Sequence, residues 1–254
     1  MAGAQAPVRA VAGDPALRGW RAQVNLLKTA CVKLLPAEPM NTVLLALRDA
    51  DQAAAWAAEL RADGCWQLPP AVHSLTGLRQ ALDRWQPALL VADLQFADGL
   101  LADLVRVLRN GGRQQNLPVL AVAFHEQDPL LLSALQAGTD SFLMTAGLTP
   151  GELQARVADT VAGGADIAPW IARHLLDHFG VGLQAALKPR VEELSNPLAL
   201  AATEHRLLRQ LSAGLRLNDL AAVEGVRPRE LTARVRAIYR KMQWALRAGD
   251  LSLV

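Results

Sequence analysis

Basic side chains gather near the end of the chain, where they alternate with apolar residues in a helical pattern. The apolar residues recur at intervals of three and four, which predicts one amphipathic helix through Leu231, Val235, Ile238 and Met242. The remaining positions carry side chains that can contact a polyanion, namely Arg229, Thr232, Arg234, Arg236, Arg240 and Lys241. A helix with a basic face and an apolar face suits the major groove of DNA, because its cationic groups hold phosphates and read base edges.

Position along this helix divides the residues by expected role. The N-terminal end is expected to approach base edges, through Arg227, Arg229, Thr232 and Ala233. Arg236, Arg240 and Lys241 lie farther along and are expected to hold phosphates, and Arg236 is also counted among the readout residues. The alternative is a basic face that is only solvated, since an Arg-rich face is common on soluble helices.

Two shorter helices must position the basic one. Apolar residues at helical spacing predict them, with Leu207, Leu208 and Leu211 in the first, which Gly214 ends, and Leu217, Leu220 and Ala221 in the second. Ala221, Gly225 and Leu231 supply the small residue, the turn glycine and the buried aliphatic residue that two closely packed helices require. Pro228 suits the first turn of the last helix. These features predict a helix-turn-helix domain over residues 198–254.

Charge is distributed unevenly along the chain. Residues 1–40 hold five bases and two acids, residues 41–165 hold eight bases and thirteen acids, and residues 195–254 hold ten bases and five acids. An acidic middle joined to a basic end is typical of a regulatory module joined to a module that binds a polyanion.

Residues 41–162 alternate short apolar segments with amphipathic ones, which predicts βαβ units around a parallel sheet. Strands are expected at residues 43–47, 71–73, 89–93, 119–123 and 141–144. Helices are expected at residues 51–63, 76–85, 100–110, 128–137 and 149–162. The predicted fold class is therefore a doubly wound α/β domain with a five-stranded parallel sheet, followed by an all-α helix-turn-helix domain. A segment at 163–197 connects the two domains, with a helix at 169–179 and a linker at 180–197.

Residues 1–40 form an N-terminal extension. Asp14 and Pro15 suit a helix start, apolar residues at alternating threes and fours follow, and Pro36 ends the pattern. This amphipathic helix would pack on its own domain, or would serve dimerisation or docking. A third alternative is that translation starts at Met40.

Other motifs indicate ordinary structure. Cys31 and Cys65 are too few for a disulfide framework or a zinc site, and no apolar segment is long enough to span a bilayer. His174 and His178 share a helical face, but no third ligand lies nearby in the sequence, so no metal site is assigned. Because enzyme motifs and a secretory signal are also absent, we expect a cytoplasmic protein that is not an enzyme and has no membrane partner.

The segment TEHRLLRQLSAGLRLNDLAAVEGVRPRELTARVRAIYRKM resembles the LuxR/NarL-type helix-turn-helix. The matching residues include Glu204, Leu208, Ala213, Gly214, Leu215, Ala221, Gly225 and Leu231. Arg216 and Arg227 replace the Ser or Thr caps usual in the family, and Glu224 stands where a buried aliphatic residue is usual. The family's final helix corresponds to WALRAGDLSLV, which is short and contains Gly249. The resemblance implies a homodimer that binds double-stranded DNA.

Residues 41–162 resemble the receiver domain of two-component response regulators. In the segment PALLVADLQFADG, Asp93 falls at the phosphoacceptor position. Leu47 and Arg48 stand where two acids should bind Mg²⁺, Ala123 stands where a hydroxyl residue is usual, and Thr145 replaces a lysine. The resemblance therefore implies a pseudo-receiver that acts without aspartyl phosphorylation.

Three hypotheses concern ligands and charge in these regions. Asp49 and Asp51 could form a rearranged Mg²⁺ pocket, or Arg48 could pair with Asp93 and imitate an occupied site. Trp170 and Arg173 faintly resemble a Trp-x-x-Arg element that binds cyclic di-GMP in some pseudo-receiver regulators. An ordinary packed helix accounts better for the Trp170 segment.

The sequence as a whole predicts a homodimeric, DNA-binding transcriptional regulator. Another regulator and RNA polymerase are its further candidate partners. One alternative is a phosphorylation-dependent response regulator that uses Asp93. The second alternative is an adaptor whose basic end docks on a protein and does not bind DNA.

Overall fold

The computed structural model describes residues 41–111, 114–125, 127–185 and 199–251. The predicted N-terminal extension lies outside these residues, and so does most of the predicted linker. The helical region and the α/β domain that precedes it belong to one unit of tertiary contacts.

Short runs of Val, Leu and Ala form a parallel sheet. Its strands lie in the order β2-β1-β3-β6-β7, with bounds β1 Asn41–Ala46, β2 Trp66–Gln67, β3 Leu89–Asp93, β6 Val119–Ala123 and β7 Ser141–Met144. β3 and β6 are buried along their whole length, as expected for a parallel sheet that is covered on both faces. The chain winds first toward β2 and then reverses toward β7, so the predicted doubly wound α/β class is confirmed.

The position predicted for the second strand was wrong. The strand lies at Trp66–Gln67, and Val72 makes only an isolated bridge with Ala46. Pro69 and Pro70 separate the two places, and they lack the backbone N–H that a continuous ladder needs. A short antiparallel hairpin of β4 (Gln95–Phe96) and β5 (Gly99–Leu100) follows β3 and was not predicted.

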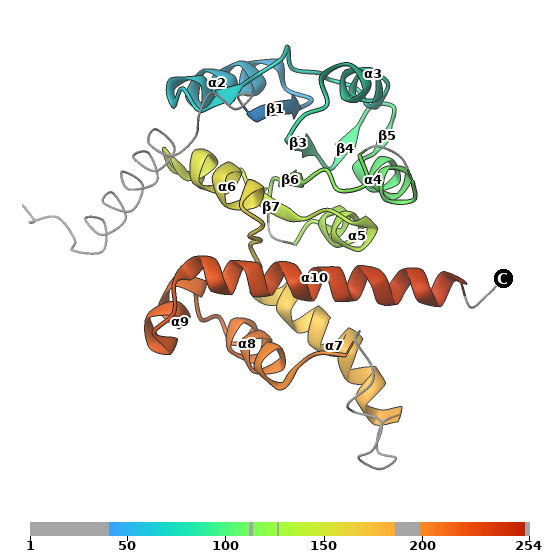
Figure 1. The fold of residues 1–254 in the computed structure, drawn as a ribbon, viewed down its shortest axis with the longest axis vertical. Helices are drawn as coiled ribbons and strands as arrows, with labels where there is room; N and C mark the ends of the chain where they lie inside the picture. The colour runs from blue at the N-terminus through green and yellow to red at the C-terminus, as the bar shows by residue number, and fades with distance from the viewer. Residues whose placement is uncertain (1–40, 112–113, 126, 186–198, 252–254) are drawn as a thin grey trace, which may run out of the picture. The chain divides into compact units, whose positions relative to one another are not determined.

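Helices cover both faces of the sheet (Figure 1). α2 (Ala50–Ala62) and α6 (Glu152–Val161) pack together on one face. α3 (Leu75–Trp85), α4 (Leu101–Arg109) and α5 (Pro129–Ala137) lie on the other. The side chains of Asp49, Ser74 and Asp128 accept backbone N–H groups at the starts of α2, α3 and α5, which fixes where these helices begin.

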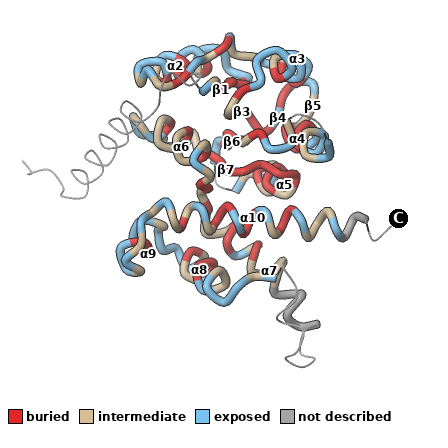
Figure 2. Tube along the Cα trace, viewed as in Figure 1, coloured by how far each residue is buried: buried red, intermediate tan, exposed pale blue. Residues whose placement is uncertain are grey.

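The alternation of side chains along β1 divides the core into two apolar clusters. Val43 and Leu45 point toward the cluster that contains α2 and α6, and Leu44 and Ala46 point toward the cluster on the opposite face. Figure 2 shows the strands β3 and β6 as buried between exposed helix surfaces. The second cluster also includes residues of the helical region, such as Tyr239.

In the described part of the C-terminal region lie four helices: α7 (Pro169–Ala185), α8 (Ala202–Ser212), α9 (Leu217–Glu224) and α10 (Pro228–Leu251). α7 is longer than predicted, because the helix continues through Gly180 into the segment assigned to the linker. A separate final helix was also a wrong prediction, because the chain continues in α10 from Pro228 to Leu251. No glycine or proline interrupts residues 229–248, so nothing in that segment breaks the helix.

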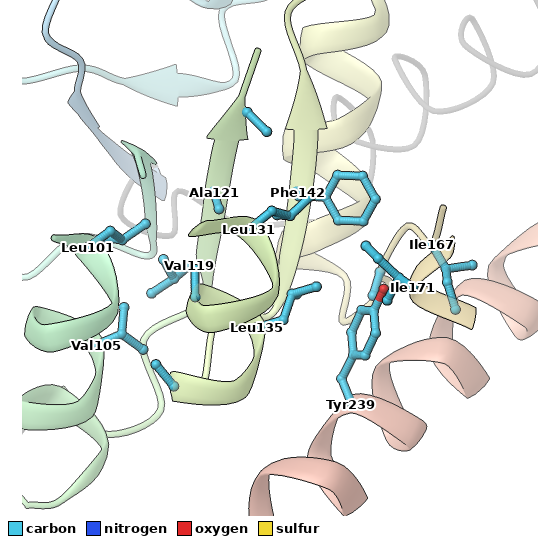
Figure 3. Packing of buried hydrophobic residues seen from close by; sticks show 14 of the residues in the cluster. Leu101, Val105, Val119, Ala121, Leu131, Leu135, Phe142, Ile167, Ile171 and Tyr239 are labelled. Atoms are coloured by element: carbon cyan, nitrogen blue, oxygen red, sulfur yellow. The ribbon is translucent and has the colours of Figure 1, made fainter. Parts of the chain in front are cut away.

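α10 is buried on two faces. Leu231, Val235, Ile238 and Met242 form the apolar face that packs on α8 and α9, as predicted. A second face, made of Arg236, Tyr239 and Gln243, packs toward the α/β domain. Figure 3 shows the ring of Tyr239 beside Ile171 and near Phe142 of β7. The Tyr239 hydroxyl donates a hydrogen bond to the backbone oxygen of Asp166 at 2.8 Å.

The burial of Tyr239 predicts a large effect on stability. Tyr239→Ala should lower the free energy of unfolding by about 3–5 kcal/mol, because it leaves a cavity between the two regions. Tyr239→Phe should cost about 1 kcal/mol, because it removes only the hydrogen bond to Asp166. Urea denaturation followed by circular dichroism measures both, with Val107→Ala at an exposed position of α4 as control. A loss for Tyr239→Ala no larger than for the control would contradict this packing.

Candidate nucleic-acid interface and the pocket of the sheet

The turn between α9 and α10 is held by a glycine and by an acidic residue. Gly225 ends α9 with φ +66°, in the left-handed region that favours glycine. Glu224 forms ion pairs with Arg234 of α10 at 3.2 Å and with Arg206 of α8 at 4.0 Å. The glutamate that replaces the usual aliphatic residue therefore joins all three helices, which the sequence alone did not indicate.

Four of the predicted DNA-contacting residues are exposed: Arg227, Arg229, Ala233 and Arg240. Arg229, Ala233 and Arg240 follow helical spacing and so share one face of α10. The Arg227 side chain is 85% exposed, and its Nε donates to Glu230 at 3.0 Å. Arg216 and Ala201, at the starts of α9 and α8, provide no side-chain cap.

Arg234 and Lys241 are held by carboxylates within the helical region. Arg234 pairs with Glu224, and Lys241 contacts Glu204 at 2.6 Å and donates to the backbone oxygen of Ala199 at 3.1 Å. Glu204 also accepts the backbone N–H of Ala201 at the start of α8. Lys241 therefore ties α10 to the first turn of α8, and binding a phosphate would compete with this ion pair.

Thr232 and Arg236, which were predicted to contact DNA, contact the α/β domain in the structure. The Thr232 hydroxyl donates to Asp159 at 3.2 Å, and the Thr232 backbone oxygen accepts the N–H of Ala165 at 3.1 Å. Arg236 is buried and pairs with Asp140 at 2.5 Å. These two side chains face the α/β domain, because they share the helix face that carries Tyr239.

Asp140 is the most connected acid at this contact, and sequence reasoning missed it. Its Oδ2 accepts from Arg109 Nη2 at 3.0 Å and from the Val119 N–H at 2.8 Å, while its Oδ1 pairs with Arg236. Burial raises the pKa of the Asp140 carboxyl, and the two guanidinium groups oppose that rise. The sequence feature that could have identified Asp140 is its position as an isolated acid directly before the apolar segment SFLM.

Arg109 is fixed by several backbone acceptors. Its guanidinium donates to the backbone oxygens of Gly138, Gln115 and Leu117 at 2.8–3.0 Å. Gly138 has φ +122°, and a Cβ at this position would lie 2.7 Å from Cγ of Arg109. A residue without a side chain is therefore required where Arg109 crosses the chain.

The carboxyl ends of the strands enclose a cavity of about 660 Å³ around Asp93. Asp93 Oδ2 accepts the backbone N–H of Arg48 at 2.7 Å, and Arg48 Nε lies 3.5 Å from the same oxygen. The predicted Arg48–Asp93 pair is therefore within salt-bridge range, but the Arg48 side chain is 63% exposed. Burial raises the pKa of Asp93, although the contacts with Arg48 oppose this rise.

The side chains of Asp49 and Thr145 beside Asp93 make contacts with the backbone. The Asp49 side chain is turned to the start of α2, where it accepts the N–H groups of Asp51 and Gln52. Ala123 is buried, and the Thr145 hydroxyl is 3.4 Å from the Ala123 backbone oxygen. Among the residues that the structure describes, no three His, Cys, Asp or Glu side chains could hold a metal ion together. The Asp49 carboxylate, which the rearranged Mg²⁺ pocket would use, is thus engaged at the start of α2.

The Trp170 segment packs as an ordinary helix. Trp170 lies partly buried against the core, and Arg173 donates to the backbone oxygen of Ser212 at 3.3 Å. Burial and the neighbouring His174 lower the pKa of His178. None of the helices within the described ranges has the length and apolar character to cross a membrane.

The strand order and the pocket at the strand ends agree with the resemblance to receiver domains. The α/β domain has the receiver topology. No protein family model matches the sequence, and no curated protein matches it.

Solved structures resemble the chain at low identity. A response regulator of Salmonella typhimurium, RcsB, described in connection with DNA interaction, is 17% identical, covers 85% of this chain and 100% of its own, and has a TM-score of 0.44. A receiver domain of a response regulator from Bermanella marisrubri is 25% identical. The match covers 47% of this chain and 97% of that domain, with a TM-score of 0.43. A LuxR-family DNA-binding response regulator from Staphylococcus aureus is 11% identical. The match covers 48% of this chain and 98% of that structure, with a TM-score of 0.43. The strand order, rather than these likenesses, identifies the fold.

The pocket predicts how Asp93 responds to a phosphoryl donor. Incubation with acetyl phosphate and Mg²⁺ should leave the protein unmodified, because the Asp49 carboxylate is engaged as a helix cap and Arg48 contacts Asp93 Oδ2. Intact-mass spectrometry measures this, with Asp93→Asn as the matched control. A phosphoryl adduct on the unmodified sequence that is missing from Asp93→Asn would contradict the prediction.

Proposed function

We propose that this chain is a sequence-specific DNA-binding transcriptional regulator whose degenerate receiver domain acts without aspartyl phosphorylation. The observation that carries the proposal is the exposed stripe of Arg229, Ala233 and Arg240 on α10, beside the turn at Gly225. Arg229 and Ala233 lie near the N-terminal end of this helix, which is the end that reads base edges in helix-turn-helix proteins. Arg240 lies farther along and is suited to a phosphate.

Ion pairs among the three helices support this role. Base readout requires side chains on a helix whose orientation is fixed, because a bidentate hydrogen bond tolerates little displacement. Glu224 fixes α9 and α8 to α10 through Arg234 and Arg206, and Glu204 fixes the start of α8 through Lys241. We propose that two copies of the chain bind a palindromic or directly repeated site, as dimeric helix-turn-helix proteins do.

The pocket supports regulation that is independent of phosphorylation. Receiver chemistry needs a metal to neutralise the phosphoryl oxygens and a lysine to hold one of them. Thr145 takes the place of the lysine, and Asp49 is engaged as a helix cap. A domain with these replacements is suited to positioning the helical region, and a signal other than phosphorylation would then control it.

Binding to DNA predicts distinct effects for two exposed arginines. Arg240→Ala should weaken binding to all sequences and reduce the slope of log affinity against log salt by about 0.9, because one phosphate contact is lost. Arg229→Ala should reduce the preference for a selected site over random DNA by about 1–3 kcal/mol, because a base contact is lost. Fluorescence anisotropy with a random-sequence duplex pool, and with duplexes selected from it, measures both effects.

Arg79→Ala is the matched control for these variants, because Arg79 is an exposed arginine on α3 of the α/β domain. Its salt slope and its selectivity should equal those of the unmodified chain. If neither the unmodified chain nor any variant binds DNA in a way that depends on salt concentration, an adaptor whose basic end docks on a protein becomes the better explanation.

A further inference from the structure

The reading face of α10 is divided between solvent and the α/β domain. Arg229, Ala233 and Arg240 are exposed, whereas Thr232 and Arg236 contact Asp159 and Asp140. A DNA duplex that approached this face would meet the α/β domain at the positions of Thr232 and Arg236. Full use of the face therefore requires α10 to separate from the α/β domain.

Asp140 stands at the centre of the contact that must break. Its two carboxylate oxygens serve different parts of the chain: Oδ2 holds Arg109 and the Val119 N–H, and Oδ1 holds Arg236. Both guanidinium groups are largely buried, with side chains 8% and 7% exposed. Their charges are therefore poorly screened, and each depends strongly on the carboxylate between them.

The two arginines are not held equally. Arg109 donates to backbone oxygens of Gly138, Gln115 and Leu117 as well as to Asp140, so it stays with the α/β domain. Arg236 has Asp140 as its acidic partner, and its buried Nε and Nη1 have no hydrogen-bond partner within the described part of the chain. An incompletely paired buried cation weakens the closed contact, because its desolvation is only partly compensated.

Neighbouring contacts join the same two surfaces, and the boundary between α10 and the residues it contacts there is called the seam below. Gln243 donates to the backbone oxygens of Leu135 and Thr139 at the end of α5, at 2.8 and 3.1 Å. The Ala165 N–H donates to the Thr232 backbone oxygen at 3.1 Å and so joins the segment before α7 to α10. Loss of the central ion pair would act on all of these contacts together, since they lie along one face of one helix.

We propose that Asp140 and Arg236 form a latch that controls access to the reading face of α10. In the closed state, Asp140 holds Arg236 away from DNA. When the pair separates, Arg236 and Thr232 join Arg229 and Arg240 on one continuous basic face. This inference rests on the proposed function for its role in DNA binding, but the opening of the latch can be measured without DNA.

Asp140→Asn tests the latch in the full chain. The substitution keeps the shape and removes the charge, which leaves two buried guanidinium groups without a carboxylate. Hydrogen exchange of the Ala165 amide, followed by NMR, should become at least about tenfold faster, because that amide bonds across the seam. The affinity for a random-sequence duplex pool should rise roughly tenfold, because a larger fraction of molecules has an open reading face.

Asp103→Asn is the matched control, because Asp103 makes an exposed ion pair with Arg106 at 2.8 Å and lies on α4. It should change neither the exchange at Ala165 nor the affinity for DNA. The Ala121 amide in β6 reports on the α/β domain, where Arg109 also loses its carboxylate in Asp140→Asn, so its exchange should accelerate less than that of Ala165 in this variant and not at all in Asp103→Asn.

Arg236→Met tests the latch from the other side. A methionine removes the ion pair with Asp140 but leaves no unpaired guanidinium at position 236, so exchange at Ala165 should become faster, though by less than in Asp140→Asn. The affinity for the duplex pool should not rise.

The outcomes separate the latch from the proposed function. Faster exchange at Ala165 in Asp140→Asn, with slow exchange at Ala121 but no binding to DNA, would support the latch and overturn DNA binding. Unchanged exchange at Ala165 in Asp140→Asn would overturn the latch, as would equal acceleration at Ala165 and Ala121. Unchanged exchange at Ala165 in Arg236→Met would also overturn it, because the closed contact would then not depend on the ion pair of Asp140 and Arg236.

Discussion

The apolar core of the α/β domain continues into the helical region. Phe142 on β7, Ile171 on α7 and Tyr239 on α10 belong to one buried cluster, although nearly a hundred residues separate the first from the last. Burying this surface is favourable, so the second face of α10 cannot leave the domain without exposing a fully buried tyrosine. This packing decides which side chains of the basic helix face solvent.

Electrostatic interactions at the two ends of the sheet's strands differ in strength because their solvent exposure differs. At the carboxyl end, Arg48 approaches Asp93 with a side chain that is 63% exposed, so water screens most of the interaction. At the other end, Asp140 pairs with arginines that are almost completely buried. The acid that matches the receiver phosphoacceptor is therefore less tightly coupled to its partner than the acid that contacts α10.

Sequence patterns predicted the sheet better than they predicted the placement of the basic face. Runs such as LLVAD and VLAVA are strands at the expected residues, because burial on both faces demands continuous apolar segments. The same periodicity found the apolar face of α10. It could not show that Thr232 and Arg236 pack against another domain, because their partners Asp159 and Asp140 are distant in sequence and polar residues carry no periodic signal. The role of Glu224 was missed for the same reason, since its partner Arg206 lies on α8.

The three faces of α10 also constrain how this part of the sequence can evolve. One face carries the apolar residues that hold α8 and α9, the second carries the contacts with the α/β domain, and the third carries the basic stripe. Within the described part of α10, Ala237 and Trp244 are exposed and belong to none of these sets. Substitutions in this helix are therefore least constrained at these few positions, because the other faces are committed to α8, α9, the α/β domain or the basic stripe.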